Sequence, residues 1–326
     1  MKIHWQRRDS HAICRPLKHR SLEEGNDMSL IIVGSLALDT IEAPAGSVAE
    51  VPGGSSSYCS LAASYFTHPK LVGIVGEDFP ESVITLFEDH HIDLEGLVVA
   101  AGKTFRWGGR YAENFDTRDT LFTELNVFED FNPELPGTYQ EADYVLLANI
   151  HPGLQHHVLD QLKTKSFVVL DTMNLWIDTA HDELMKLMKR VDMLVINDEE
   201  ALMLTQERHF GKAARKLQAM GPEWVIIKKG QHGAMLFHHD RIFNVPGLIL
   251  DEVRDPTGAG DTFVGAMIGY LDQSRDHSFD NMKLAVVFGS VLASYCVEDF
   301  SVDGITYLEE SDLEERYDEF VIVSQF

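Results

Sequence analysis

Cysteine is scarce in this sequence of 326 residues, and familiar metal-binding patterns are missing. Its three cysteines, Cys14, Cys59 and Cys296, lie far apart, and neither a CxxC nor an HExxH motif occurs. This spacing excludes a disulfide framework and indicates a reducing compartment, so we expect a cytoplasmic protein. Adjacent histidines occur without zinc spacing, and we expect them to be surface residues. They are His90/His91, His156/His157 and His238/His239.

Basic residues are also few. Lysine and arginine together number 27 against 52 aspartates and glutamates, which gives a formal net charge of −25 at pH 7. So acidic a chain is not expected to bind nucleic acid or an acidic membrane surface, although a locally basic pocket remains compatible with it. No apolar run approaches the roughly 18 residues of a membrane-spanning helix, so we expect no membrane span.

Residues 1–27 differ from the rest of the chain. They carry arginine, lysine, histidine and serine up to Arg20 and have no apolar period, and a strand-like run begins only after Met28. Without an apolar central region the segment is not a secretory signal. We expect a disordered extension, or an upstream start with Met28 as the working start, and a targeting peptide is the alternative. The folded domain is then 28–326.

Short apolar runs alternate with helical segments over most of this domain. With 44% hydrophobic residues the chain can bury the core of one large α/β domain. The alternation predicts a mostly parallel central sheet with helices on both faces. The expected strands lie at 30–34, 71–75, 144–148, 167–170, 193–196, 224–228, 234–237 and 241–245, and the expected helices at 58–66, 81–90, 211–220, 279–297 and 309–319.

The interval 103–128 interrupts this alternation. Residues 104–111 and 120–125 have the pattern of two strands of a hairpin, with no crossover helix between them. A polar stretch with glycine and proline also follows Asp39 and runs to Pro52.

The segment 255–265 predicts an anion site at the start of a helix. Gly258 and Gly260 let successive backbone N–H groups point the same way, and the helix terminus adds its positive dipole end. Asp261 follows in the first helical turn, where we expect the dipole to keep its carboxylate ionised and able to accept a proton from an attacking hydroxyl. A plain glycine-rich turn with Asp261 as a helix cap is the alternative.

The longer pattern D-x-T-G-A-G-D-x-F-x-G at 255–265 closely resembles the C-terminal signature of the ribokinase-like (PfkB) family of small-molecule kinases. The resemblance covers roughly residues 30–305 and implies a three-layer α/β sandwich with a small β lid. It implies that Gly258, Ala259 and Gly260 form the anion hole for the transferring phosphoryl group, and that Asp261 is the catalytic base.

The acceptor site follows from two further matches to this family. Gly34-Ser35-x-x-x-Asp39 resembles the first-strand motif whose Asp holds the hydroxyls of the acceptor, and Gly53-Gly54 resembles the N-terminal signature, with Ser55 beside it. Ribokinase has Gly-Gly-Lys-Gly-Ala-Asn where this chain reads Gly-Gly-Ser-Ser-Ser-Tyr, and Asn where it has Ala37. These departures argue against ribose itself. Gly-Gly-Ser is closer to the adenosine-kinase branch.

The resemblance also implies a site for ATP and Mg²⁺. Asn197 and Glu200 match the family's N-x-x-E motif, which holds magnesium through water. Residues 226–230 resemble the family's strand end before the nucleotide turn, and we expect Lys228 to bind the ATP phosphates as a point charge. Gly230 and Gly233 flank the nucleotide turn. A solvated helix start would account for 197–200 equally well. Asp171 follows another expected strand. It either contributes to a site at the carboxyl-terminal edge of the sheet or caps a helix.

Two weaker implications concern a cation and the lid. Asp255 and Thr257 match positions that bind a monovalent cation in many relatives, so K⁺ is an expected cofactor. The lid consists of segments about 39–52 and 103–126 and is a possible homodimer contact. It offers Arg106 as a substrate contact, together with Phe105, Trp107 and Arg110. Packing of some of these aromatic residues against the lid's own face is the alternative.

These observations together predict an ATP-dependent kinase that phosphorylates a hydroxyl of a sugar or sugar-like substrate. A nucleoside kinase is the alternative within the family, and a non-catalytic ligand-binding protein on the same scaffold is the alternative from another class. An NAD-dependent Rossmann enzyme is disfavoured, since no GxGxxG follows the first strand.

Overall fold

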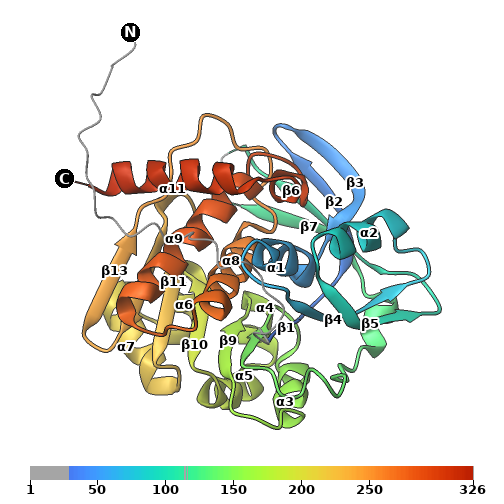
Figure 1. Ribbon diagram of the computed structural model, residues 1–326, viewed down its shortest axis with the longest axis horizontal. Helices are drawn as coiled ribbons and strands as arrows, with labels where there is room; N and C mark the ends of the chain where they lie inside the picture. Colours follow the sequence, from blue (N-terminus) through green and yellow to red (C-terminus); the bar gives the residue numbers. More distant parts are fainter. Residues whose placement is uncertain (1–28, 114, 116, 326) are drawn as a thin grey trace.

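The computed structural model describes residues 29–113, 115 and 117–325, so the predicted extension 1–27 lies outside the described residues. A nine-stranded sheet forms the centre of the molecule in the order β13-β12-β11-β10-β9-β8-β1-β4-β5 (Figure 1). All its pairs are parallel except β11–β12 and β12–β13. The strands are β1 (Leu30–Val33), β4 (Lys70–Gly76), β5 (Asp93–Ala100), β8 (Tyr144–Leu147), β9 (Phe167–Asp171), β10 (Met193–Asn197), β11 (Trp224–Lys228), β12 (Ala234–His238) and β13 (Arg241–Val245).

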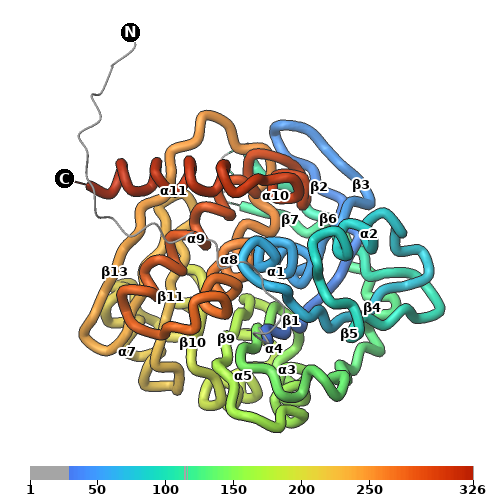
Figure 2. The backbone as a smooth tube through the Cα atoms, in the orientation of Figure 1, coloured from blue at the N-terminus to red at the C-terminus, as the bar shows by residue number. Residues whose placement is uncertain are grey.

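Helices cover both faces of this sheet, as predicted. One layer contains α1 (Ser55–Ser64), α2 (Glu81–Asp89), α8 (Ala259–Ser274), α9 (Phe279–Cys296), α10 (Asp303–Thr306) and α11 (Glu310–Ser324). The other contains α3 (Pro152–Asp160), α4 (Asn174–Thr179), α5 (His181–Leu187), α6 (Asp198–Thr205) and α7 (Phe210–Met220). Figure 2 shows the chain path; the dark blue first strand, β1, lies inside the sheet between β8 and β4.

The two-residue period of the strands builds the core on both sides of the sheet. In β1, Leu30 and Ile32 join the cluster under α1, α8 and α9, whereas Ile31 and Val33 join the cluster under α3, α5 and α7. All four side chains are fully buried. A strand buried on both faces reads as a continuous apolar run, which is why the sequence predicts these strands well.

A second sheet of four strands, which we call the lid, stands beside the first. Its order is β3 (Gly46–Gly53), β2 (Ala37–Ala43), β6 (Phe105–Tyr111) and β7 (Arg118–Glu124). The hairpin β6–β7 is confirmed. The polar stretch after Asp39 is not irregular, however: it forms the hairpin β2–β3, and β2 pairs in parallel with β6. Most of β3 is exposed, so its sequence carries no apolar alternation.

Further elements differ from the sequence prediction. Strand β5 and the helices α3, α4, α5 and α10 were not predicted, and α1 begins at Ser55 rather than at 58. The early start of α1 has a local cause, because the Ser55 amide donates to Ser35 Oγ and the Ser35 amide donates to Ser55 Oγ. Across the described part of the chain, none of the helices combines the length and the apolar character needed to cross a membrane.

Candidate functional site

Polar residues end three neighbouring parallel strands at one edge of the sheet. Asp171 ends β9, Asn197 ends β10 and Lys228 ends β11. The strand register places Asp171 opposite Val195 and Asn197 opposite Lys228. Since the carboxyl ends of parallel strands meet at a common edge, these side chains come together there, which is where open α/β sheets bind ligands.

Lys228 forms an ion pair within this group. Its ammonium nitrogen lies 3.3 Å from Asp171 Oδ1, with 18% of the lysine and 9% of the aspartate side chain exposed. Burial lowers the pKa of Lys228, because it disfavours the charged ammonium. The negative charges of Asp171, Glu200 and Asp261 have the larger effect and raise the pKa of this lysine above its usual value. Lys228 is therefore a fixed positive charge, and Asp171 is its partner rather than a helix cap, since α4 begins after Met173.

Asn197 and Glu200 form a reciprocal capping box at the start of α6. The Glu200 amide donates to Asn197 Oδ1 at 2.8 Å, and the Asn197 amide donates to Glu200 Oε2 at 2.9 Å. Glu200 is only 7% exposed, so this helix start is not simply solvated. Burial raises the pKa of Glu200 to about 7, although the charge of Lys228 lowers it. Amide and carboxylate oxygens at this edge are a donor set that suits Mg²⁺.

The turn before α8 faces this edge. Gly258 caps the helix with φ 76, in the left-handed region that favours glycine, and a Cβ there would lie 2.3 Å from the Tyr58 ring. A Cβ on Gly260 would lie 3.0 Å from Lys228 Nζ, so the lysine head lies directly against this turn. Ala259 and Gly260 are the first residues of α8, and Asp261 lies in its first turn.

Asp261 is more basic than the sequence predicts. Burial, with a smaller contribution from the negative charge of Asp171, raises the pKa of Asp261 to about 7, although Lys228 and Arg118 lower it. The expectation that the helix dipole keeps this carboxylate ionised is therefore wrong, because loss of hydration outweighs the dipole. A pKa near neutrality suits a group that accepts a proton.

Asp39 brings a second carboxylate from the lid. It lies on β2 and is 4% exposed, and a Cβ on Gly53 would lie 2.0 Å from its Oδ2. Burial and the charges of Asp255 and Asp261 raise the pKa of Asp39 to about 7, although the Gly54 amide lowers it. Among the described residues, no hydrogen-bond partner reaches the buried Asp39 Oδ1. This oxygen is therefore available to accept a hydrogen bond from a hydroxyl of a bound ligand.

Gly53, Gly54 and Ser55 join this part of the lid to α1. Gly53 ends β3, and Gly54 caps α1 with φ 84. The hydroxyl of Ser55 bonds Ser35, so its role as a substrate contact stays a prediction.

The loop 255–257 is anchored at Asp255, which is fully buried. Asp255 Oδ1 accepts from the Thr257 amide at 2.9 Å, and Oδ2 accepts from the Ser301 amide at 3.2 Å. The Thr257 hydroxyl donates to Tyr111 Oη at 3.0 Å, which connects the signature loop to the lid. Asp255 thus connects the loop 255–257, where a monovalent cation is predicted to bind, to the loop that contains Ser301.

Two predicted residues of the nucleotide turn lie between β11 and β12. Gly230 has φ 53 and begins a short 3₁₀ turn, Gly230–His232, and Gly233 follows it with φ 82. This turn directly follows Lys228, at the same edge of the sheet.

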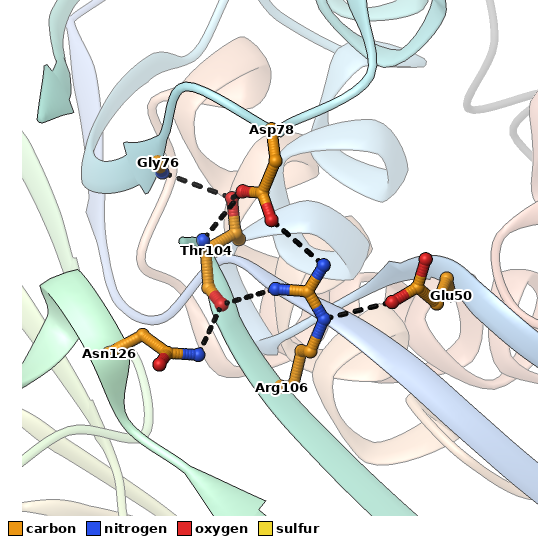
Figure 3. Close-up of polar contacts among 6 residues, drawn as sticks. All are labelled: Glu50, Gly76, Asp78, Thr104, Arg106 and Asn126. Carbon is orange, nitrogen blue, oxygen red and sulfur yellow. Dashed lines mark hydrogen bonds and ion pairs between the residues drawn. The ribbon is translucent and has the colours of Figure 1, made fainter. Parts of the chain in front are cut away.

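The predicted substrate contact Arg106 is held by other residues. Its Nε donates to Glu50 at 2.9 Å, and its two terminal nitrogens donate to Asp78 at 2.8 Å and to the Thr104 carbonyl at 3.1 Å (Figure 3). All three nitrogens are therefore engaged, and they tie β3 and β6 of the lid to the loop after β4. Contact with substrate stays a prediction for Arg106.

The sequence prediction includes Trp107 among the possible substrate contacts of the lid but misses Arg118. The guanidinium of Arg118 lies 5.0 Å from the centre of the Trp107 ring, and its charge lowers the pKa of both Asp39 and Asp261. Trp107 is the register partner of Asp39, so both side chains share one face of the lid. No signal in the sequence could identify Arg118, because the face of a lid strand follows from its pairing.

The arrangement as a whole can hold a polyanion and remove a proton. Lys228 and the amides around Gly258–Gly260 supply positive charge. Asp39 and Asp261 are two carboxylates with a pKa of about 7, and Asp261 lies close enough for its charge to raise the proton affinity of Asp39. Fixed positive charge beside a general base is the combination that phosphoryl transfer to an alcohol requires.

Comparisons with known proteins identify the family of this chain. The pfkB family carbohydrate kinase model matches residues 29–305. The cytidine kinase of Thermococcus kodakarensis is 27% identical over 253 residues, which cover 76% of this chain and 90% of that protein. Fructokinase-2 of Oryza sativa subsp. japonica is 25% identical over 278 residues, covering 78% of this chain and 81% of that protein.

Solved structures share the fold. The nucleoside kinase of Methanocaldococcus jannaschii superposes with a TM-score of 0.70 at 18% identity, over 90% of this chain and 100% of that one. A ribokinase II of E. coli in complex with ATP and Mg²⁺ superposes with a TM-score of 0.73 at 17% identity. The match covers 90% of this chain and 99% of that one. The three-layer fold predicted from the sequence is confirmed.

Proposed function

This chain belongs to the pfkB family of carbohydrate kinases, and from that membership we propose that it transfers the γ-phosphate of ATP to a hydroxyl of a sugar or sugar-like substrate. Its class is that of phosphotransferases with an alcohol as acceptor. The residue assignment is supported by the closeness of Asp261, beside the Gly258 turn, to Asp39 of the lid, since the charge of Asp261 raises the pKa of Asp39.

In the proposed mechanism Asp39 accepts a hydrogen bond from an acceptor hydroxyl through its unpaired Oδ1. Asp261 takes the proton of the hydroxyl that reacts. The oxygen of that hydroxyl bonds to the γ-phosphorus, the bond from this phosphorus to the β,γ-bridging oxygen breaks, and ADP leaves with the electron pair. The amides around Gly258–Gly260 stabilise the charge on the transferring group.

Lys228 is proposed to bind the phosphates of ATP as a fixed charge, with Asp171 holding its head against Gly260. Mg²⁺ is proposed to bind near Asn197 and Glu200, where it neutralises phosphate charge. K⁺ is proposed near Asp255 and Thr257. Turnover that is unchanged when K⁺ is replaced by tetramethylammonium would contradict the K⁺ proposal.

A nucleoside is the second candidate acceptor, and Trp107 is the observation that favours it. This partly exposed ring lies on the same face of the lid as Asp39, with Arg118 over it. An aromatic plane beside the hydroxyl-binding carboxylate can stack on a base, a contact that a sugar alone does not use.

The experiment is a panel of sugars and nucleosides with ATP and Mg²⁺, followed by coupled detection of ADP release. The wild type is compared with Trp107→Ala. A nucleoside kinase is expected to lose at least about tenfold in kcat/KM on Trp107→Ala, corresponding to about 1.4 kcal/mol of stacking, whereas a sugar kinase changes little. Tight binding of a ligand with no ADP release across the panel would instead indicate a non-catalytic binding protein.

A further inference from the structure

An open cleft of about 540 Å³ lies at the opposite edge of the sheet from the proposed catalytic site. It is bordered by the first residues of the parallel strands, Tyr144 of β8, Phe167 of β9 and Trp224 of β11, and by His238 at the end of β12. None of these residues takes part in the proposed kinase site, which is built from the carboxyl ends of the same strands.

Three potential metal ligands gather at one side of this cleft. One ligand atom from each of Glu223, His238 and His239 lies within 4.8 Å of the other two. Metal–ligand distances of about 2.0–2.2 Å place the ligand atoms around one zinc ion roughly 3.5 Å apart. Glu223 and His239 are exposed. Rotation of their side chains can therefore bring the ligand atoms from within 4.8 Å of one another to the shorter spacing that one zinc ion requires, without moving the backbone.

The backbone explains why two consecutive histidines face the same point. In a regular strand successive side chains point to opposite faces. His239, however, follows the last residue of β12 with φ 50, a left-handed conformation uncommon for a residue other than glycine. This turn brings the His238 and His239 rings to a centroid separation of 4.3 Å. Glu223 directly precedes β11, and it lies near the two histidines because Trp224, the first residue of β11, pairs with His238 in the β11–β12 ladder.

The His238 ring is fixed by its neighbours and has an unused nitrogen. It stacks on Trp224 with 3.7 Å between centroids and 6° between planes, which holds its orientation. Its Nδ1 is buried and meets no hydrogen-bond partner among the described residues. Buried polar atoms normally have a partner, so this nitrogen calls for one. Arg241, the register partner of His238 on β13, has its guanidinium over the Phe279 ring, 4.0 Å from the ring centre.

We propose that Glu223, His238 and His239 form a binding site for a divalent transition-metal ion of the zinc type at this edge of the sheet. Two imidazoles and a carboxylate are the donors that Zn²⁺ prefers, and three protein ligands leave a fourth position for water or a further ligand. Mg²⁺, which requires oxygen ligands, does not fit this donor set. Sequence spacing alone misses the site, because the third ligand comes from the neighbouring strand.

The test is calorimetric titration of the metal-free full chain with Zn²⁺, repeated in millimolar Mg²⁺. Wild type is compared with His239→Ala and Glu223→Gln, two exposed positions whose replacement leaves the core intact. His91→Ala is the matched control: His91 is also exposed, also follows a histidine and also has a positive φ, 56. Its ring lies 5.4 Å from His68, but this pair has no third metal ligand within reach among the described residues.

The wild type is expected to bind one Zn²⁺ tightly in the presence of Mg²⁺. Each of His239→Ala and Glu223→Gln is expected to weaken this site at least tenfold, and His91→Ala to leave it unchanged. Equal weakening by His91→Ala, undiminished binding by His239→Ala, or displacement of Zn²⁺ by Mg²⁺ would each overturn the proposal. Because the readout is metal binding, the outcome does not depend on the kinase activity.

Discussion

The ammonium of Lys228 and the carboxylate of Asp171 lie 3.3 Å apart across the end of β10, almost removed from solvent. Removing one partner leaves the other charge buried, and such a change costs about 3 kcal/mol or more. Lys228→Met is therefore expected to lower the free energy of unfolding by this amount and to raise the KM for ATP. Urea unfolding and initial rates measure the two effects.

The double variant Asp171→Asn/Lys228→Met separates these effects. It removes both charges of the ion pair, so part of the stability is expected to return, although Glu200 and Asp261 also lose the charge of Lys228. The KM for ATP stays high because the cation is absent. A double variant as unstable as Lys228→Met, or one with normal KM for ATP, would contradict the assignment.

Asp261→Asn is expected to lower kcat by a factor on the order of 10²–10⁴, the usual contribution of a general base. Affinity for ATP is expected to change little, since the amide has nearly the same shape and retains a hydrogen-bonding oxygen. Single-turnover rates and equilibrium binding of an ATP analogue measure the two quantities. Near-normal turnover of Asp261→Asn on the true substrate would refute the role of the residue.

The activity is expected to fall as the pH decreases through about 7. Burial places the pKa of Asp261 at about 7, and only its deprotonated form can accept a proton, so the rate rises with pH until the carboxylate is fully ionised. A profile of kcat/KM between pH 5.5 and 9 checks this. A rate that stays flat down to the acid end of the profile would show that another group is the base.

Asp39→Asn is expected to stabilise the ligand-free protein at pH 8 while abolishing efficient turnover. The folded-state pKa of about 7 lies above the unfolded value of about 3.9, so the folded state binds the proton more tightly. The stability associated with this proton is present at low pH and is lost as the pH rises toward 7. A neutral amide removes the penalty, and we expect Tm to rise by about 2 °C or more.

The control for this measurement is Asp251→Asn, which neutralises an exposed loop residue. It is expected to leave Tm unchanged. At pH 4 the gain from Asp39→Asn should shrink, because Asp39 itself is then neutral in the folded state. A gain that is independent of pH would point to packing instead of charge.

Arg106→Ala is expected to raise the KM for the acceptor through the lid. The guanidinium joins Glu50 of β3 to Asp78 of the loop after β4 (Figure 3). Since Asp78 holds Arg106 from outside the lid, Asp78→Asn should reproduce much of the effect. If Arg106 touches the acceptor directly, Asp78→Asn will leave the acceptor KM unchanged while Arg106→Ala raises it. Initial rates for the three proteins decide between the two roles.

Much of the site could be predicted from the sequence because its residues follow local patterns. Asn197, Lys228 and Asp261 each follow an apolar run or open a helix, and their motifs resemble one family. The hairpin β2–β3 was missed because an exposed strand has no apolar period. Arg118 was missed because its position beside Asp39 and Asp261 depends on how β7 pairs with β6.

By itself, the sequence determined most strands of the central sheet, the longer helices and several residues at their ends, because hydrophobic period, glycine and proline act over a few neighbours. Only the tertiary structure decided which charges meet. The proton affinities of Asp39, Glu200 and Asp261, the pairing of Lys228 with Asp171, and the grouping of Glu223 with two histidines arise from burial and from charges far apart along the chain. Loss of hydration and Coulomb interaction depend on distance in space, which no local pattern of residues contains.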